Sequence, residues 1–202
     1  MMDRKARVAR ISLSDRDTLL IVDVQADFLP GGRLAVPEGD AVVPVLNGYL
    51  ALARRKGLRV FASRDWHPPN HCSFRAQGGP WPEHCVAETP GAELAPGLEL
   101  PPDAVIISKA VAAGSDAYSA FAGTDLERQL RELRIERLLV GGLATDYCVL
   151  NTVRDARKAG FEVLLLQDAI RAVNVKPGDG EHAEREMREV GAVPVHAGDL
   201  RS

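Results

Sequence analysis

Two acid–base side chains each directly follow a short apolar run of the sequence. These are Asp23 and Lys109, and Cys148 lies a few residues beyond a third such run. A carboxylate can take the proton of a thiol and later return it to a leaving amine, and a nearby ammonium group favours the thiolate. A free thiol has an ordinary pKa of about 8.5, which a helix N-terminus or a neighbouring cation lowers. The three residue types therefore predict a cysteine nucleophile assisted by Asp23 and Lys109.

Each of these residues also has a purely structural interpretation. Cys148 is equally explained as a small buried hydrophobic residue, Asp23 as a residue that caps a loop, and Lys109 as the solvated end of a strand. Thr145 is expected to cap a helix, which would place Cys148 in the first helical turn, where unpaired N–H groups favour an anion. Three such residues at neighbouring strand ends favour catalysis over three separate explanations.

A second group of residues has the composition of a metal site. Asp65 and His67 stand two positions apart, so their side chains face the same side of an extended segment, and His84 follows later in the chain. Two imidazoles and one carboxylate leave coordination positions open, as in catalytic or substrate-holding divalent sites. His71 is a candidate fourth ligand. Two alternatives are a closed structural zinc site completed by cysteine, and histidines that only cap loop backbone.

The elements that must position these residues alternate between strand and helix. Strands are predicted at 18–24, 59–63, 104–108, 137–141, 162–167 and 192–196, and helices at 40–56, 125–133, 145–158 and 181–190. Several of the strands are continuously apolar, as strands covered on both faces are. This alternation predicts a single α/β domain over residues 1–202 with a parallel sheet. Ligands of such sheets bind beyond the carboxyl ends of the strands.

One long segment interrupts the alternation. Residues 65–103 show no sustained periodicity and hold most of the prolines and both tryptophans of the chain. A connection of this length inside a compact domain is usually functional or disordered. Because Trp66, Phe74 and Trp81 argue against disorder, we predict an ordered active-site loop that carries the metal ligands.

The composition excludes several classes of protein. The 202 residues are 46% hydrophobic and 26% charged, with a net charge of −3, which is typical of a globular protein. The charge gives no reason to expect nucleic acid, and we expect neither a membrane span nor a signal peptide. Three cysteines favour a reducing compartment, so we expect a cytoplasmic enzyme. The basic segment Arg4–Arg7 is expected to be a solvated tail.

Five motifs resemble those of nicotinamidases, a branch of the isochorismatase-like cysteine hydrolase superfamily. In chain order they are Ile21–Phe28 (IVDVQADF), Arg64–His71 (RDWHPPNH), Trp81–Cys85 (WPEHC), Asp116–Phe121 (DAYSAF) and Gly142–Val149 (GLATDYCV). The wider superfamily shares the Asp/Lys/Cys set, whereas the Asp-Trp-His run with a downstream histidine is specific to the metal-containing branch. The resemblance implies the isochorismatase-like hydrolase fold, a three-layer α/β/α arrangement with a six-stranded, mainly parallel sheet.

The resemblance also implies an activity and a cofactor. Members of this branch are amidohydrolases that convert nicotinamide to nicotinate and ammonia through a cysteine thioester, a step of NAD salvage and pyridine nucleotide biosynthesis. The cofactor is a divalent metal, most often zinc, with iron or manganese as alternatives, and it orients the pyridine ring through the ring nitrogen. The implied partner is a small amide, nicotinamide or its relative pyrazinamide. Whether copies of the chain form a homo-oligomer is left open.

The matching positions assign a role to each site residue. The resemblance implies a catalytic triad of Asp23, Lys109 and Cys148. It implies an oxyanion hole formed by the N–H groups of Ala144 and Cys148, with a cis peptide bond before Ala144. The implied metal ligands are Asp65, His67 and His84, and His71 is a ligand or a supporting residue depending on the member. The substrate pocket corresponds to Phe28, Trp81, Tyr118 and Leu34.

One segment departs from the pattern of the branch. Relatives usually follow the lysine with glycine and a polar stretch, whereas this chain has Ala110–Gly114 (AVAAG). The departure bears on the shape of the pocket near Lys109 and leaves the chemistry unchanged.

Three other functions use parts of the same pattern. Another amidohydrolase of the superfamily would apply the triad to a carbamoyl or ureido substrate, but the metal run argues against it. An isochorismatase cleaves an ether without a cysteine nucleophile. A non-catalytic module that binds a metal or ligand would keep the fold without a reactive Cys148, and the complete triad argues against that.

Overall fold

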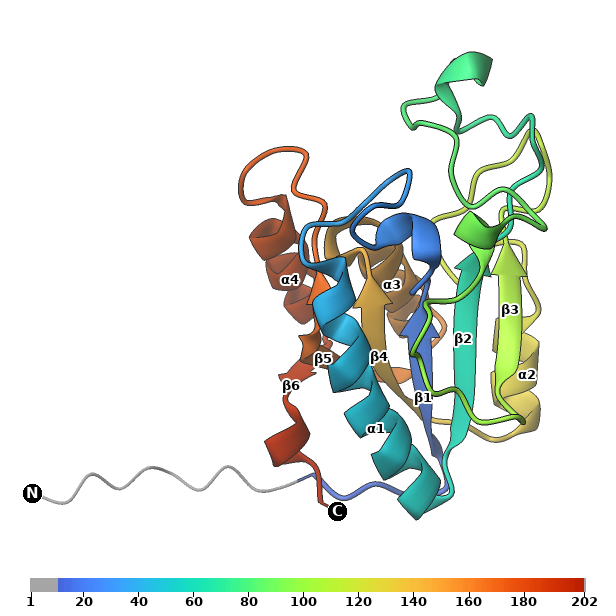
Figure 1. Ribbon diagram of the computed structural model, residues 1–202. Coiled ribbons are helices and arrows are strands. Elements are labelled where there is room, and N and C mark those ends of the chain that lie inside the picture. Colours follow the sequence, from blue (N-terminus) through green and yellow to red (C-terminus); the bar gives the residue numbers. More distant parts are fainter. Residues whose placement is uncertain (1–10, 202) are drawn as a thin grey trace, which may run out of the picture.

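The centre of the structure is a single six-stranded sheet. The structure, a computed structural model, describes residues 11–201, so the basic segment Arg4–Arg7 lies outside the described residues. The strands are β1 (Asp17–Val22), β2 (Arg59–Asp65), β3 (Val105–Lys109), β4 (Arg137–Leu143), β5 (Glu162–Arg171) and β6 (Val193–Val195). Their order in the sheet is β3-β2-β1-β4-β5-β6, and every neighbouring pair is parallel (Figure 1). The prediction of a six-stranded parallel sheet is confirmed.

Helices cover both faces of this sheet. They are α1 (Val42–Lys56), α2 (Leu126–Glu132), α3 (Leu150–Lys158) and α4 (Asp179–Glu189). Figure 1 shows α1 in front of the sheet and the other three helices behind it, and the buried residues form two clusters that match these two sides. This is the three-layer α/β/α arrangement that the resemblance implied. No helix among residues 11–201 has the length and apolar character needed to cross a bilayer.

Alternate residues of β1 face the two helical layers. Leu19 and Ile21 belong to the core cluster that includes α1, whereas Leu20 and Val22 belong to the cluster that includes α2, α3 and α4. All four side chains are at most 1% exposed. Because burying such a side chain contributes about 1.5–3 kcal/mol, a continuously apolar strand is most stable at the centre of the sheet, which is where β1 lies.

The strand β5 is longer than its apolar run predicts. That run ends at Gln167, but β5 continues to Arg171 through an irregularity in its pairing with β4. Ala169 and Ile170 are buried again beyond the irregularity. At the irregularity the pairing of β5 with β4 shifts, which interrupts the run of apolar residues. The sequence pattern therefore does not reveal that the strand continues to Arg171. The ends of the other strands, and of α1, α2 and α4, lie within two residues of their predicted positions.

The carboxyl ends of three adjacent strands bring chemical groups together. Asp23 directly follows β1, Asp65 is the last residue of β2, and Lys109 is the last residue of β3. Asp65 and Lys109 are also partners in the β2–β3 register. The parallel direction of the strands therefore puts all three side chains at one edge of the sheet.

The segment 66–104 between β2 and β3 is irregular but packed. Phe74 is 2% exposed and anchors the segment from inside. Isolated β-bridges pair Phe74 with Trp81 and His67 with Val86. These contacts fold the segment back over the carboxyl edge of the sheet, where it contributes histidines to the site (Figure 1).

Candidate active site

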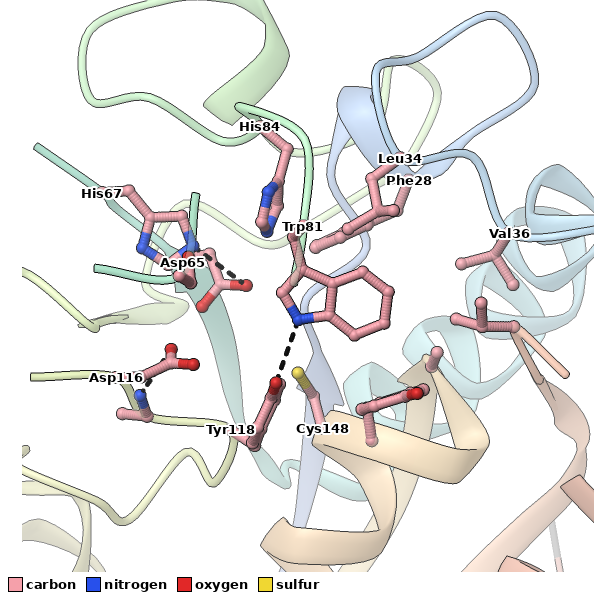
Figure 2. Close-up of a pocket in the computed structure, with 15 residues that line it drawn as sticks. Phe28, Leu34, Val36, Asp65, His67, Trp81, His84, Asp116, Tyr118 and Cys148 are labelled. Atoms are coloured by element: carbon pink, nitrogen blue, oxygen red, sulfur yellow. Dashed lines mark hydrogen bonds and ion pairs between the residues drawn. The ribbon is translucent and has the colours of Figure 1, made fainter. Parts of the chain in front are cut away.

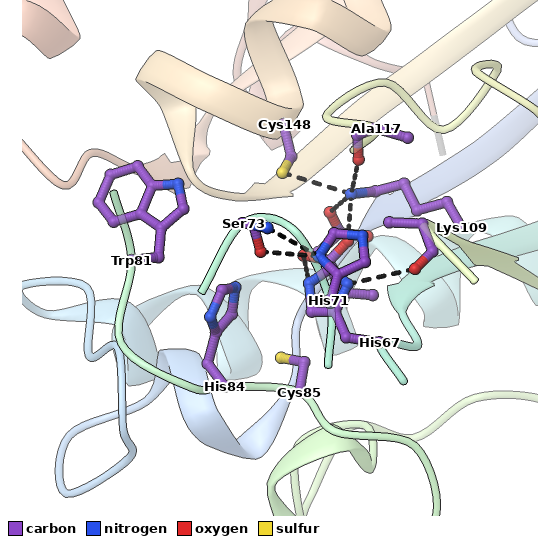
Figure 3. A network of polar contacts seen from close by, with 12 residues as sticks. His67, His71, Ser73, Trp81, His84, Cys85, Lys109, Ala117 and Cys148 are labelled. Atoms are coloured by element: carbon purple, nitrogen blue, oxygen red, sulfur yellow. Dashed lines mark hydrogen bonds and ion pairs between the residues drawn. The ribbon is translucent and has the colours of Figure 1, made fainter. Parts of the chain in front are cut away.

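Lys109 Nζ lies between the other two residues of the predicted triad. It is 3.0 Å from Asp23 Oδ2 and 3.5 Å from Cys148 Sγ, and Figure 3 shows the contact with Cys148. All three side chains are buried, with Asp23 at 0%, Lys109 at 1% and Cys148 at 5% exposure. The structure therefore brings together three residues that are far apart in the sequence, in a place that excludes bulk water.

Asp23 is held by β2 and turned toward the lysine. Its backbone adopts a positive φ of 48°, and Ser63 Oγ donates a 2.6 Å hydrogen bond to Asp23 Oδ1. The second oxygen, Oδ2, faces the ammonium group of Lys109 at 3.0 Å and has no other polar partner assigned among the described residues. A carboxylate oxygen of Asp23 lies within 4.8 Å of Cys148 Sγ. Burial raises the pKa of Asp23, and Lys109 only partly opposes this effect. Such a carboxylate has an oxygen that carries no hydrogen bond from a neutral group, and enough basicity to take a proton from a thiol.

Cys148 lies in a wide π-helical turn, Thr145–Val149, that precedes α3. The prediction that Thr145 caps this helix is wrong, because the N-cap position is Ala144, one residue earlier, and no side chain caps the helix. Val149 N–H and Tyr147 N–H both donate to Ala144 O at 3.1 Å. Thr145 is instead the first residue of the helical turn, and its side chain is buried.

The environment of Cys148 does not favour a thiolate at rest. Burial raises the pKa of Cys148 well above its usual value, and the favourable effect of Lys109 does not overcome this. The expectation that a helix N-terminus and a cation would lower this pKa therefore fails, because the thiol is buried next to two carboxylates. The resting residue is a thiol, and it needs a base to become a nucleophile.

Ala144 stands next to the thiol on the wall of the same pocket. The peptide bond between Leu143 and Ala144 is cis, as the resemblance implied. Ala144 and Cys148 both line the pocket. The assignment of their N–H groups to an oxyanion hole stays a prediction.

The three predicted metal ligands form one buried cluster. One atom each of Asp65, His67 and His84 lies within 4.8 Å of the others, and all three residues are at most 5% exposed. His67 Nδ1 contacts Ala110 O at 3.3 Å, and His84 Nδ1 contacts Pro82 O at 2.8 Å. These backbone contacts fix each ring and leave its Nε2 for a ligand, as in many metal sites.

One ring nitrogen of this cluster has no hydrogen-bond partner within residues 11–201, which indicates that the cluster can bind a cation. His67 Nε2 is buried and has no hydrogen-bond partner among the described residues. Burial lowers the pKa of His67 to about 4, so the ring is neutral near pH 7 and its lone pair is available to a metal. Burial also lowers the pKa of His84. Two neutral imidazoles and a carboxylate are a donor set that suits zinc or another divalent transition metal.

His71 lies behind this cluster. Its Nδ1 contacts Ser73 Oγ at 2.8 Å and its Nε2 contacts Ser115 O at 3.2 Å, so both ring nitrogens are engaged. The ring stacks on His67 with 4.1 Å between the centroids. Of the two roles open to His71, this geometry favours support of His67 over ligation.

Asp65 belongs to both groups of residues. Its Oδ1 accepts a 2.6 Å hydrogen bond from Lys109 Nζ, and its Oδ2 is 3.7 Å from His67 Nε2. Although burial alone would raise the pKa of Asp65, the charge and the hydrogen bond of Lys109 lower it overall. The carboxylate is therefore ionised and shared, a link that the sequence did not reveal.

A pocket opens between the thiol and the histidines (Figure 2). All four predicted pocket residues line it: Phe28, Leu34, Trp81 and Tyr118. Trp81 Nε1 donates a 3.0 Å hydrogen bond to Tyr118 Oη, drawn as a dashed line in Figure 2. Several other residues that line the pocket were not predicted from the sequence: Val36, Ser73, Asp116, Ala117, Tyr147 and Val173. Ala144 was predicted only for the oxyanion hole, and it lines the pocket as well. Asp116, Ala117 and Tyr147 belong to the motifs given above, so the motifs could have identified them as pocket residues.

The segment Ala110–Gly114, which departs from the pattern of related sequences, contacts the residues around the site through its backbone carbonyl groups. Ala110 has a positive φ of 52°, a conformation that favours glycine. Its carbonyl contacts His67 Nδ1, and Ala113 O accepts a 2.7 Å hydrogen bond from Cys72 N–H. Because these contacts use backbone atoms, alanine can supply them as glycine would, at a cost in backbone strain.

Comparisons with known proteins agree with this site. The isochorismatase domain family matches residues 17–199. A nicotinamidase from Escherichia coli is 43% identical over 195 residues, which cover 86% of this chain and 92% of the relative. The crystal structure of a pyrazinamidase from Pyrococcus horikoshii in complex with zinc has a TM-score of 0.86 and 51% identity, covering 90% of this chain and 99% of that one. PnC1 from L. infantum, in complex with nicotinate, has a TM-score of 0.84 and 37% identity, covering 95% and 98%.

Proposed function

The chain belongs to the isochorismatase family and is a hydrolase that acts on amides, and we propose that it is a nicotinamidase. The main support for this proposal is that the nucleophile and the predicted metal ligands line opposite sides of one pocket. One wall holds Cys148 beside Lys109, and the other holds His67 and His84 beside Asp65. A nucleophile on one side and a set of metal ligands on the other suit a substrate with an amide at one end and a ligating nitrogen at the other. Nicotinamide has both.

The aromatic residues of the pocket suit a flat ring. Phe28 and Trp81 line it, and Tyr147 packs edge-on against Trp81 with 5.0 Å between the ring centroids. Flat aromatic surfaces bind a pyridine ring by stacking and edge-to-face contact, each worth about 0.5–1.5 kcal/mol. Asp65, His67 and His84 would hold the divalent metal, which when bound supplies a Lewis-acid contact for the ring nitrogen. The same geometry suits pyrazinamide.

The first half of the reaction forms a bond to sulfur. Asp23 takes the proton of Cys148 Sγ, and the thiolate attacks the amide carbon. The N–H groups of Ala144 and Cys148 receive the negative oxygen, and one such donor is worth about 3–4 kcal/mol in comparable sites. Asp23 then returns the proton to the nitrogen, the C–N bond breaks, and ammonia leaves a thioester.

The second half of the reaction releases the acid. Asp23 takes a proton from water, the hydroxide attacks the thioester carbon, and the C–S bond breaks. Asp23 then returns its proton to Cys148 Sγ to restore the thiol, and the carboxylic acid loses its own proton to solvent and leaves as nicotinate. Proton transfer by a positioned group contributes about 10²- to 10⁴-fold to such a step. Lys109 keeps its charge throughout, because Asp23 and Asp65 raise its pKa well above the usual value although burial alone would lower it. A permanent ammonium group holds the carboxylate and stabilises the sulfur anion as it forms.

The test is a paired measurement of ammonia and nicotinate. The zinc-loaded protein is expected to release both in equal amounts from nicotinamide, and removal of metal with a chelator is expected to raise KM. Benzamide, which has the amide but no ring nitrogen, is the matched control and is expected to turn over poorly with or without metal. Faster ammonia release from an N-carbamoyl amino acid than from nicotinamide would contradict the proposal and favour a carbamoyl amidase.

A further inference from the structure

The side chain of Gln25 makes three buried hydrogen bonds that the proposed reaction does not use. Gln25 is 0% exposed. Its Nε2 donates to Asp65 O at 2.8 Å and to Ala92 O at 2.9 Å, and its Oε1 accepts from Asp65 N–H at 2.8 Å. Both backbone groups of Asp65 are therefore bonded to a single side chain.

This pairing replaces a missing stretch of strand. The ladder between β1 and β2 runs to Ile21 and Ala62, after which Asp23 turns the chain away with its positive φ. β2 continues to Asp65 and keeps its neighbour β3 on the other side, where Trp66 N–H donates to Lys109 O. In a parallel pair the N–H and C=O of one residue point to the same neighbour, so those of Asp65 face the place that β1 has left.

A carboxamide is suited to fill that place. It offers one acceptor and two N–H donors, the groups of a peptide unit, so it satisfies a buried N–H and a buried C=O together. The second N–H reaches Ala92, in the short helix of the segment that covers the site. Gln25 therefore ties the end of β2 to that segment as well as to the loop after β1.

We propose that Gln25 is a positioning residue that orients Asp65 for its two partners. With its backbone fixed on both sides, Asp65 presents Oδ1 to Lys109 at 2.6 Å and Oδ2 toward His67 at 3.7 Å. Loss of the Gln25 hydrogen bonds frees the Asp65 peptide and lets the carboxylate move relative to both partners. The inference rests on the proposed function only in taking Asp65 as a metal ligand, and it does not depend on which amide is the substrate.

Two isosteric substitutions test this role on the full chain. Gln25→Glu keeps an acceptor for Asp65 N–H but places a carboxylate against two carbonyl oxygens, and Gln25→Met removes all three hydrogen bonds without a new charge. Gln77→Glu is the matched control, because Gln77 is exposed in the same covering segment. The zinc dissociation constant is measured on metal-free protein by competition with a chromogenic chelator. Both Gln25 variants are expected to bind zinc about 10- to 100-fold more weakly than wild type, as is typical when a residue that holds a metal ligand is replaced. Gln77→Glu is expected to bind zinc as tightly as wild type.

A second readout follows Lys109. The pH dependence of Cys148 alkylation, measured by peptide mass mapping on metal-free protein, is expected to shift in both Gln25 variants because the ion pair of Asp65 with Lys109 is displaced. A residue that only stabilises the fold would lower the melting temperature without moving this profile.

The outcomes separate this inference from the proposed function. Zinc binding by Gln25→Met within twofold of wild type, with an unchanged alkylation profile, overturns the inference. Failure of both Gln25 variants to fold overturns it too, because Gln25 would then support the fold rather than orient Asp65, and so does wild-type protein that binds no zinc. If wild type binds zinc and the Gln25 variants bind it weakly, but nicotinamide is not hydrolysed, the proposed function fails and the role of Gln25 stands.

Discussion

Lys109 Nζ donates a 2.6 Å hydrogen bond to Asp65 Oδ1, and this bond joins the predicted nucleophilic triad to the predicted metal ligands. The same ammonium group is 3.0 Å from Asp23 Oδ2. One buried cation thus faces two buried carboxylates, which leaves an excess of one negative charge before the thiol gives up its proton. Buried charge without a partner is costly. The imbalance is a further reason for these residues to bind a divalent cation.

Replacing Cys148 with alanine is expected to abolish ammonia release from nicotinamide and to leave the fold intact. The change removes only one sulfur atom from a residue at the end of a pocket, so the circular dichroism spectrum should not change. Cys72→Ala is the control, since Cys72 is a partly exposed cysteine outside the pocket lining, and it should keep near wild-type turnover. Full activity of Cys148→Ala would contradict the assignment of the nucleophile.

His67→Ala and Asp65→Asn are expected to differ although each removes a metal ligand. His67 touches the metal cluster but not the triad, so its loss should release zinc and raise KM while metal-free Cys148 alkylates at an unchanged rate. Asp65→Asn also removes the charge that faces Lys109, so it should lower kcat as well as raise KM. Zinc content, kcat and KM of the two variants check this. Identical kinetic defects would show that the link from Asp65 to Lys109 is of no consequence.

Replacing Lys109 with methionine is expected to destabilise the metal-free protein by about 3–5 kcal/mol near neutral pH, because two buried carboxylates lose their counterion. Without Lys109 the folded-state pKa values of Asp23 and Asp65 rise above their unfolded values. The stability of the variant is then highest at acid pH and is lost as the pH rises through those folded-state values. The gap to wild type should therefore be smaller at about pH 5 than at about pH 8 in urea unfolding.

The wild-type protein should also lose stability as the pH rises, but only in the alkaline range. The pKa of Lys109 is raised above its unfolded value, so its stabilising effect is complete below about pH 10.5 and is lost at higher pH. Lys56→Met, at an exposed position at the end of α1, is the control and should show neither effect. Equal destabilisation of Lys109→Met at both pH values would mean that lost packing, not charge, is the cause.

Tyr118→Phe is expected to raise KM by about fivefold with little change in kcat. The substitution removes the hydrogen bond that Trp81 donates to Tyr118, and such a bond is worth about 1 kcal/mol. Tyr49→Phe makes the same chemical change away from the pocket, where Tyr49 Oη donates to Asp168 at 2.7 Å. It should lower the free energy of unfolding and leave KM alone. A shift in KM for Tyr49→Phe, or none for Tyr118→Phe, would argue against an aromatic wall that orients the ring.

Gly142→Ala is expected to destabilise the protein by about 3 kcal/mol, because overpacking at a tight contact costs that much. A Cβ at this position would stand 2.1 Å from Val22 O, and the residue has a φ of +130°. Gly48→Ala, in α1 with nothing within 4 Å of the new Cβ, should instead stabilise by up to about 1 kcal/mol. Urea unfolding of the two variants checks the contrast, and a neutral Gly142→Ala would mean that β1 and β4 are not in close contact there.

Much of this fold follows from local pattern, for a physical reason. A run such as Leu19–Val22 is apolar on both faces because helices cover both sides of a central strand. Once the strands are parallel, residues just past their ends share one edge of the sheet, so Asp23, Lys109 and Cys148 are expected to approach one another without any knowledge of the strand order.

The contact between Asp65 and Lys109 needs more than that. It depends on β2 and β3 being neighbours in the sheet with Asp65 paired to Lys109. The hydrophobic periodicity of a sequence shows which segments are strands, but it gives neither their order in the sheet nor their register. The raised pKa of Cys148 depends likewise on total burial, which a helix N-terminus in the sequence does not reveal. Thr145 does not cap the helix, because the N-cap position falls on Ala144 and the side chain of Thr145 is buried.

The most direct test of the proposed thioester mechanism is to look for the acyl group on Cys148 Sγ during turnover. Zinc-loaded protein is mixed with nicotinamide, quenched in acid at short times, and digested for peptide mass mapping. We expect a nicotinoyl group on Cys148 that disappears when the substrate is consumed, and none on Cys72 or Cys85. Active protein in which Cys148 is unmodified at every time point would contradict it.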